Sequence, residues 1–121
     1  MKDIDLYRYK AEVTRIIDGD TVELRVFLGF NIYKLQTIRL FGVNCPESRT
    51  TNPDEKKLGI AAKEFTEKTI PPGTIVHVRT IKYDKYGGRC NGIIYMDDDK
   101  TLNQELLDNG HAKEYLATLP A

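Results

Sequence analysis

The chain has 121 residues, and its 18 Lys and Arg side chains equal its 18 Asp and Glu side chains in number, so the formal net charge is zero. This balance argues against a protein that coats nucleic acid by bulk positive charge, and 40% apolar with 30% charged residues argues against intrinsic disorder. No stretch approaches the roughly 20 consecutive apolar residues that span a bilayer, and residues 1–5 show no secretory signal, so we expect an intracellular protein without a membrane partner.

Three strands are predicted in the first third of the chain. Residues 7–17 alternate in polarity as a half-buried strand does, and Asp18-Gly19-Asp20 is a hairpin signal because Gly accepts a positive φ. Residues 21–28 form the returning strand, and residues 33–43 form a third strand in which Gly42 marks a bulge. The residues of the second strand that we expect to face the core are Val22, Leu24, Val26 and Leu28.

A helix is predicted over residues 57–69, after a polar loop over residues 48–56. The loop carries helix-start chemistry at residues 52–55, since Asn, Pro and acidic side chains favour the first turn of a helix. The helix ends before Ile70-Pro71-Pro72-Gly73, and Gly59 is expected to be a weak point within it.

Two further strands and a second helix complete the predicted elements. The strands cover residues 74–82 and 89–96, and Thr101 with Gln104 forms a capping box for a short helix that stops at Gly110. Five strands with a helix inserted after the third favour a mainly β fold with helices. Among several folds compatible with this pattern, we predict a five-stranded OB-fold-like barrel plus two α-helices.

Two charged side chains are predicted to lie where burial is expected. Asp20 has the same parity as Val22 and Leu24, so its carboxylate should face inward and must be paired, protonated or bound to a cation. The alternative is a turn Asp that hydrogen-bonds its own backbone. Arg39 lies among the apolar residues Ile38 and Leu40, where a structural ion pair would account for it.

Two polar segments accompany the later strands. Asn44-Cys45-Pro46-Glu47 leaves a strand abruptly and carries an amide and a carboxylate, although a surface loop is the alternative interpretation. Asp84, Lys85, Tyr86 and Arg89 mix charge with an aromatic ring around two glycines, which would let a backbone approach a ligand closely. The alternative for this second segment is an ordinary solvated hairpin.

Together these segments supply the parts of a site for phosphoryl chemistry. A hard divalent cation prefers oxygen ligands, which are available from Asp20, Asn44 and the main chain near Cys45. Phosphate oxygens match the guanidinium forks of Arg39 and Arg89. Glu47 is the carboxylate available to orient or deprotonate water. Cys45 and Cys90 match no zinc spacing and are expected to be reduced thiols.

The sequence resembles the staphylococcal nuclease (thermonuclease) family in four separate blocks. The blocks, in chain order, are Ile17-Asp18-Gly19-Asp20-Thr21-Val22, Ile38-Arg39-Leu40-Phe41-Gly42-Val43-Asn44-Cys45-Pro46-Glu47, Asp84-Lys85-Tyr86-Gly87-Gly88-Arg89, and Leu102-Asn103-Gln104-Glu105-Leu106 leading to Gly110. Their order and rough spacing agree from about residue 7 to residue 115. We therefore expect a single domain of this type over residues 1–121, with its core at about residues 7–115.

The resemblance implies an OB-fold enzyme that uses calcium and cleaves DNA and RNA to leave a 3′-phosphate. Asp20 would be the first calcium carboxylate, and the Cys45 carbonyl would be the main-chain ligand. Arg39 and Arg89 would bind phosphate, and Glu47 would activate or position the attacking water. In line attack on phosphorus would then place charge on oxygens that calcium and the two arginines stabilise.

The resemblance also implies a single strand of DNA or RNA as the substrate, with no obligate protein partner. Lys85 and Tyr86 would flank the bound nucleotide. Tyr115 is out of register by one position with the tyrosines that stack on the nucleotide in the best-known members. An extra Gly before Arg89 also shifts the expected reach of that arginine by a residue.

Asn44 is the departure that divides two hypotheses. The best-known members place a second calcium carboxylate at its position, so calcium should bind more weakly, or another divalent ion should be accepted. The first hypothesis is a metal-dependent nuclease, because Asp20, Arg39, Glu47 and Arg89 are retained. The second is a catalytically weak or inactive module that binds nucleic acid or protein.

Overall fold

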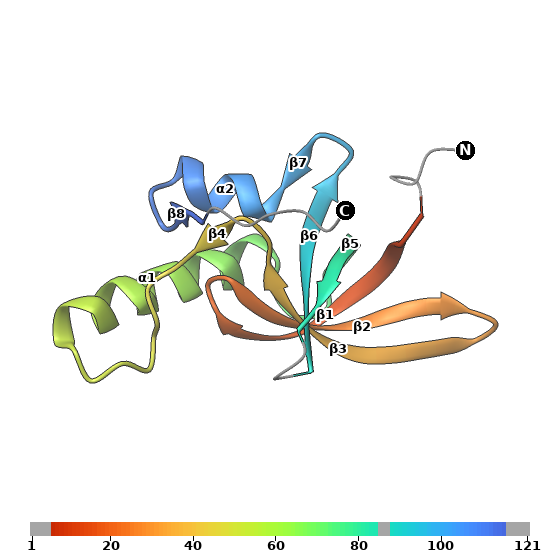
Figure 1. The fold of residues 1–121 in the computed structure, drawn as a ribbon, viewed down its shortest axis with the longest axis horizontal. Helices are drawn as coiled ribbons and strands as arrows, with labels where there is room; N and C mark the ends of the chain where they lie inside the picture. Colours follow the sequence, from red (N-terminus) through yellow and green to blue (C-terminus); the bar gives the residue numbers. More distant parts are fainter. Residues whose placement is uncertain (1–5, 85–87, 116–121) are drawn as a thin grey trace.

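Five long strands form a closed barrel in the computed structural model, which describes residues 6–84 and 88–115. Neighbouring strands are antiparallel in the order β3-β2-β1-β5-β6, and a parallel pairing of β3 with β6 closes the barrel (Figure 1). The strands are β1 (Arg8–Asp18), β2 (Thr21–Gly29), β3 (Ile32–Leu40), β5 (Ile75–Tyr83) and β6 (Arg89–Asp97). The predicted mainly β, OB-fold-like barrel with two helices is confirmed.

The two helices and three very short strands lie at one side of the barrel (Figure 1). The strands β4 and β8 pair antiparallel with each other, and β7 pairs with β6. Neither helix of the described ranges is long and apolar enough to cross a membrane. The elements are β4 (Val43–Asn44), α1 (Pro53–Thr69), β7 (Lys100–Thr101), α2 (Leu102–Asp108) and β8 (Lys113–Glu114).

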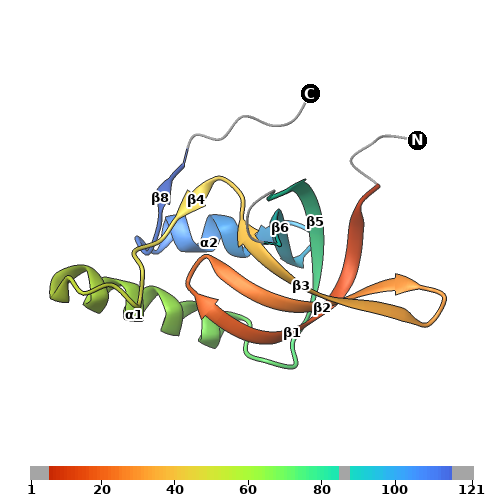
Figure 2. The ribbon, with the colours of Figure 1, turned by 60° about the horizontal axis from the view of Figure 1, so that its bottom comes forward.

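The core-facing row of β2 follows the prediction for three of its four members. Val22, Leu24 and Val26 are buried, whereas Leu28 is 43% exposed, so its predicted inward burial is wrong. The physical reason is length: the hairpin of β2 and β3 extends beyond the barrel, where no further strand of the described residues covers it (Figure 2). The barrel interior therefore opens at this end.

The third strand ends earlier than predicted. It stops at Leu40 rather than at residue 43, and Gly42 has a φ of 80°, so Gly42 forms a turn instead of a bulge within a strand. The side chain of Asn103 holds this turn, because its Nδ2 donates to the carbonyl oxygen of Phe41 at 2.9 Å and its Oδ1 accepts from the N–H of Ile94 at 3.1 Å. The turn directs the chain into β4.

Helix α1 begins four residues before its predicted start and ends where the prediction placed its end. Asn52 is the N-cap, since its side-chain oxygen accepts from the N–H groups of Asp54 at 3.0 Å and Glu55 at 3.2 Å. Pro53 occupies the first turn, where its missing N–H costs nothing. The helix-start chemistry predicted for residues 52–55 is thus the true helix boundary.

Gly59 lies where α1 crosses the loop that follows β4. A Cβ at this position would lie 2.1 Å from the carbonyl oxygen of Glu47 and 2.6 Å from the nitrogen of Ser48. The predicted weak point of the helix is instead a contact point, because only a residue without a side chain lets α1 pack against this backbone.

We expect Gly59→Ala to destabilise the protein by about 2 kcal/mol, since overpacking against a rigid backbone costs roughly 1–3 kcal/mol. The free energy of unfolding in urea measures the effect. In a helix that packs against nothing at this position, the same change would stabilise the protein by about 0.5–1 kcal/mol. The sign of the change in unfolding free energy therefore distinguishes a packed Gly59 from an unpacked one. Lys57→Ala, at an exposed position of α1, is the control and should change stability by less than about 0.5 kcal/mol. A stabilised Gly59→Ala variant would contradict the packing described above.

Candidate active site

The carboxylate of Asp20 is buried at the turn between β1 and β2. The residue is only 6% exposed, and its Oδ2 accepts from the backbone N–H of Cys45 at 2.8 Å, while Oδ1 accepts from the hydroxyl of Thr21 at 3.0 Å. Its own carbonyl oxygen accepts from the N–H of Leu40 at 2.8 Å. The predicted inward orientation of Asp20 is confirmed, and the carboxylate is paired with distant segments of the chain.

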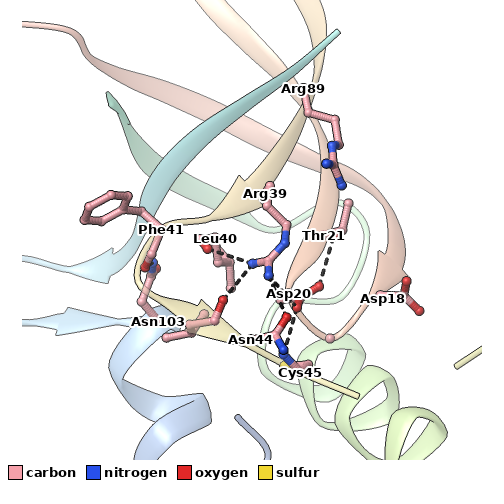
Figure 3. A network of polar contacts seen from close by, with 12 residues as sticks. Asp18, Asp20, Thr21, Arg39, Leu40, Phe41, Asn44, Cys45, Arg89 and Asn103 are labelled. Atoms are coloured by element: carbon pink, nitrogen blue, oxygen red, sulfur yellow. Dashed lines mark hydrogen bonds and ion pairs between the residues drawn. The ribbon is translucent and has the colours of Figure 1, made fainter. Parts of the chain in front are cut away.

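Arg39 projects from β3 onto this carboxylate (Figure 3). Its Nη2 lies 3.3 Å from Asp20 Oδ2 and donates to Asn44 Oδ1 at 2.9 Å. Its Nη1 donates to the carbonyl oxygens of Leu40 at 2.9 Å and Val43 at 2.8 Å. The structural ion pair predicted for Arg39 therefore exists, and its side chain is 20% exposed. The guanidinium fixes the chain between the end of β3 and β4 through four contacts.

Arg89 begins β6 beside the same cluster. It lies opposite Thr37 in the parallel ladder with β3, and its guanidinium points toward the pair formed by Arg39 and Asp20 (Figure 3). Its Nη2 lies 3.1 Å from Asp84 Oδ2, and its side chain is 45% exposed. The extra Gly before it, Gly88, takes a positive φ of 65°.

The two arginines line one cleft of about 340 Å³, which we call the arginine cleft. Asn44 and Tyr115 also line it. Tyr115 is 59% exposed, and its backbone N–H donates to the carbonyl oxygen of Gly42 at 2.9 Å. Tyr115 is therefore placed within reach of the arginines despite its shifted register. Lys85 and Tyr86, predicted to flank a nucleotide, lie outside the described residues.

Glu47 is exposed and lines a neighbouring groove of about 530 Å³ between β4 and the start of α1. The structure therefore does not place it in the arginine cleft itself. Asn44 lines both the groove and the cleft, and it marks their boundary. Cys45 also lines the groove, so Glu47 lies two residues from the backbone that contacts Asp20.

Asp18 holds the backbone of the Glu47 loop, and sequence reasoning missed this role. Its Oδ1 accepts from the N–H of Ser48 at 3.2 Å and also from the Ser48 hydroxyl. Ser48 is buried, and its neighbour Glu47 presses its carbonyl against Gly59. In the sequence, Asp18 was recognised only as part of a turn signal. The Ser directly after Glu47 was the one residue that could have indicated a hydrogen-bonded loop.

The thiol of Cys45 is unsuited to nucleophilic attack. Burial raises its pKa to about 12, and the negative charge of Asp20 adds to the rise. Burial also raises the pKa of Cys90. Both cysteines are free and buried, so the prediction that they do not form a disulfide is confirmed. Within the cluster, Cys45 contributes its backbone.

The atoms around Asp20 that could bind a hard divalent cation are oxygens, as such a cation prefers, but a single carboxylate supplies their only negative charge. Among the described residues, no three His, Cys, Asp or Glu side chains gather into a group that could hold a metal ion. A cation here would rely on the Asp20 carboxylate, the amide oxygen of Asn44 and main-chain oxygen near Cys45. Arg39 already contacts Oδ2 of Asp20 and Oδ1 of Asn44, so its positive charge competes with a cation for these two oxygens.

A comparison with known protein families identifies the family of the chain. Residues 37–120 match the family described as staphylococcal nuclease homologue, and this range covers the last four residues of β3 and every later element. The chain belongs to the staphylococcal nuclease family. Membership supports a nuclease-type function at the level of the family.

Two of the relatives found are similar to the chain over most of its length. The uncharacterized protein MJ1439 of Methanocaldococcus jannaschii is 33% identical over 131 residues, which cover 90% of this chain and 60% of the relative. Endonuclease YhcR of Bacillus subtilis is 30% identical over 114 residues, which cover 88% of this chain and 9% of the relative. The chain thus spans less than two thirds of each of these relatives.

We expect the Cys45 thiol to react far more slowly than an exposed thiol with an aromatic disulfide reagent at about pH 8, because the thiolate is the reactive form. The measurement uses Cys90→Ser, so that Cys45 is the only thiol. The folded-state pKa lies above the ordinary value of 9.0, so this group's contribution to stability is intact below pH 9.0 and declines as the pH rises toward about 12. Equal rates in folded and denatured protein would contradict the burial of this thiol.

Proposed function

We propose that the chain is a divalent-cation-dependent nuclease that hydrolyses phosphodiester bonds of single-stranded DNA or RNA and leaves a 3′-phosphate. The observation that carries this proposal is the connected cluster of Asp20, Arg39 and Asn44, with Arg89 in the same cleft. The family match and the endonuclease name of a relative support it. A site with one buried carboxylate and two arginines suits an anionic substrate of this kind.

The arginines are proposed to bind the scissile phosphate. Arg89 is half exposed and exchanges its contact with Asp84 for a phosphate oxygen, which is a charge-assisted bond of similar geometry. Arg39 is held more firmly, so it presents a fixed positive charge to the same phosphate. The two guanidinium groups together stabilise the charge that develops on the phosphate oxygens in the transition state.

Glu47 is proposed to orient or deprotonate the attacking water. Its carboxylate is exposed to solvent, while its backbone is fixed by the contact with Gly59 and by the bonds between Ser48 and Asp18. A carboxylate on a fixed backbone at the edge of the substrate cleft meets the positional need of a general base. Attack then comes from the Glu47 groove toward a phosphate held in the arginine cleft.

Asp20, Asn44 and the Cys45 carbonyl are proposed to hold calcium or another divalent ion. A bound ion of this kind stabilises negative charge on the phosphate oxygens. Lys85, Tyr86 and Tyr115 are proposed to contact the nucleotide on either side of that phosphate. Tyr115 is the one of these three whose position is described, and its exposed ring lines the arginine cleft.

A second candidate function is a binding module without turnover, and Asn44 is the observation that favours it. Its amide oxygen is taken up by Arg39 Nη2, and an amide offers no second oxygen and no charge. A module of this type would retain nucleic acid in the presence of EDTA and show no cleavage. The exposed Glu47 beside the cleft favours the enzyme, since a purely binding site gains nothing from a carboxylate near phosphate.

We expect EDTA to abolish cleavage of labelled single strands, and Glu47→Gln to lower kcat by roughly 10²–10⁴-fold, the usual contribution of a general base. Arg89→Ala should lower kcat/KM by a comparable factor because it removes charge that is needed in the transition state. Glu55→Gln, a change on α1 at the same groove, is the matched control. Intact substrate with wild-type protein in calcium, magnesium and manganese would refute the nuclease.

Asn44→Asp should tighten calcium binding, because a second carboxylate adds a negative charge and a second oxygen to the ligand set. Titration calorimetry with calcium compares the variant with wild type. Asn44→Ala, which removes the oxygen altogether, is the matched variant and should bind calcium more weakly than wild type. Identical calcium affinity in all three proteins would show that residue 44 does not contact the cation.

A further inference from the structure

The barrel is open at the end opposite the helices, and side chains of three strands line the opening. Residues two positions apart on a strand share a face, so Val26 continues the buried row of β2, and Gln36 and Lys34 continue the row of Ile38 on β3. Together with Tyr83 of β5 they line a cavity of about 290 Å³. We call this cavity the barrel opening. Its volume lies near the low end for small-ligand pockets, about 300 Å³, and suits one ring system.

The floor and the rim of the barrel opening differ in chemistry. The floor is apolar, with Val26 and Ile38 buried. The rim carries the exposed side chains of Lys34, Lys82 and Tyr83. Lys34 Nζ lies 5.3 Å from the centre of the Tyr83 ring, so a cation and an aromatic face stand together. Among the described residues that line the opening there is no Asp or Glu. An anionic ligand with an aromatic part matches this combination.

The barrel opening and the arginine cleft meet the chain at neighbouring residues, at the start of β6. Gln36 is 8% exposed, and its Nε2 donates to the carbonyl oxygen of Gly88 at 2.7 Å. The next residue is Arg89, which lines the cleft, and the one after that is Cys90, which lines the opening. Successive residues of a strand point to opposite faces, so the cleft and the opening lie on the two sides of one strand end.

We propose that the barrel opening binds a further nucleotide of the same strand whose scissile phosphate lies in the arginine cleft. The base enters the apolar floor beside Tyr83, and the two phosphates that flank that nucleotide pair with Lys34 and Lys82. This proposal rests on the proposed nuclease function, which places the scissile phosphate of the strand in the arginine cleft. A nucleotide site at the barrel opening would make the enzyme prefer strands that extend beyond the cleaved bond to shorter strands.

Methyl NMR in EDTA tests the proposal without turnover. Adding a single-stranded oligonucleotide should shift the methyl signals of Val26, Ile38 and Ile81, and a dinucleotide should leave them unchanged. Failure of the nuclease assay leaves this binding measurement intact, so the two proposals fail separately. Methyl shifts absent at the barrel opening, with shifts present at the arginine cleft, would overturn the nucleotide site alone.

The variant pair Lys34→Ala with Lys82→Ala should weaken binding of the longer strand about tenfold or more, because it removes the two positive charges that are proposed to contact phosphates. The slope of its plot of log affinity against log salt concentration should be shallower than that of wild type by about 1.4, because each single-strand phosphate contact contributes about 0.7 to the slope. The matched control, Lys57→Ala with Lys68→Ala on α1, removes the same charge far from the opening and should keep the slope. Equal slopes in both pairs would overturn the proposal.

A medium-chain fatty acid serves as the competing probe, because an apolar floor with lysines at its rim also fits an alkyl carboxylate. If the oligonucleotide occupies the opening, it should displace this probe from the Val26 and Ile38 methyl groups. Tight binding of the fatty acid that the oligonucleotide does not reverse would assign the opening to an alkyl ligand, and would contradict the nucleotide site.

Discussion

The buried carboxylate of Asp20 is the interaction on which the site depends. It joins the turn after β1 to Arg39 near the end of β3 and to the Cys45 backbone after β4. The turn itself is fixed to α1, because the hydroxyl of Thr66 donates to the carbonyl oxygen of Gly19 at 2.7 Å. Burying a charge costs several kcal/mol unless it is paired and hydrogen-bonded, and here Arg39, the Thr21 hydroxyl and the Cys45 backbone supply those partners.

The zero net charge of the chain hides a strongly uneven local distribution. Arg39 and Arg89 stand on the arginine cleft, and Lys34 and Lys82 stand on the barrel opening. A protein that binds one short stretch of strand needs few phosphate contacts, and a net charge of zero limits non-specific binding. Global neutrality and a nucleic-acid substrate are therefore compatible.

The sequence predicted the barrel well because alternation and turn signals report local structure directly. It predicted the inward direction of Asp20 from parity alone, which the structure confirms. It did not reveal that Asp18 holds Ser48, or that Gly59 touches the backbone of Glu47, because these contacts join segments far apart in the chain. The exposure of Leu28 was missed for a related reason, since strand periodicity does not tell where a barrel ends.

Asp20 is a structural anchor and, in the proposed function, also the anionic part of a cation site. The shift in unfolding midpoint produced by millimolar calcium, measured for wild type and for Asp20→Asn, tests this claim most directly, because a ligand that binds only the folded state raises the midpoint. We predict a rise for wild type, and for Asp20→Asn a lower midpoint that calcium does not change. An equal calcium-induced rise in both proteins would contradict the account.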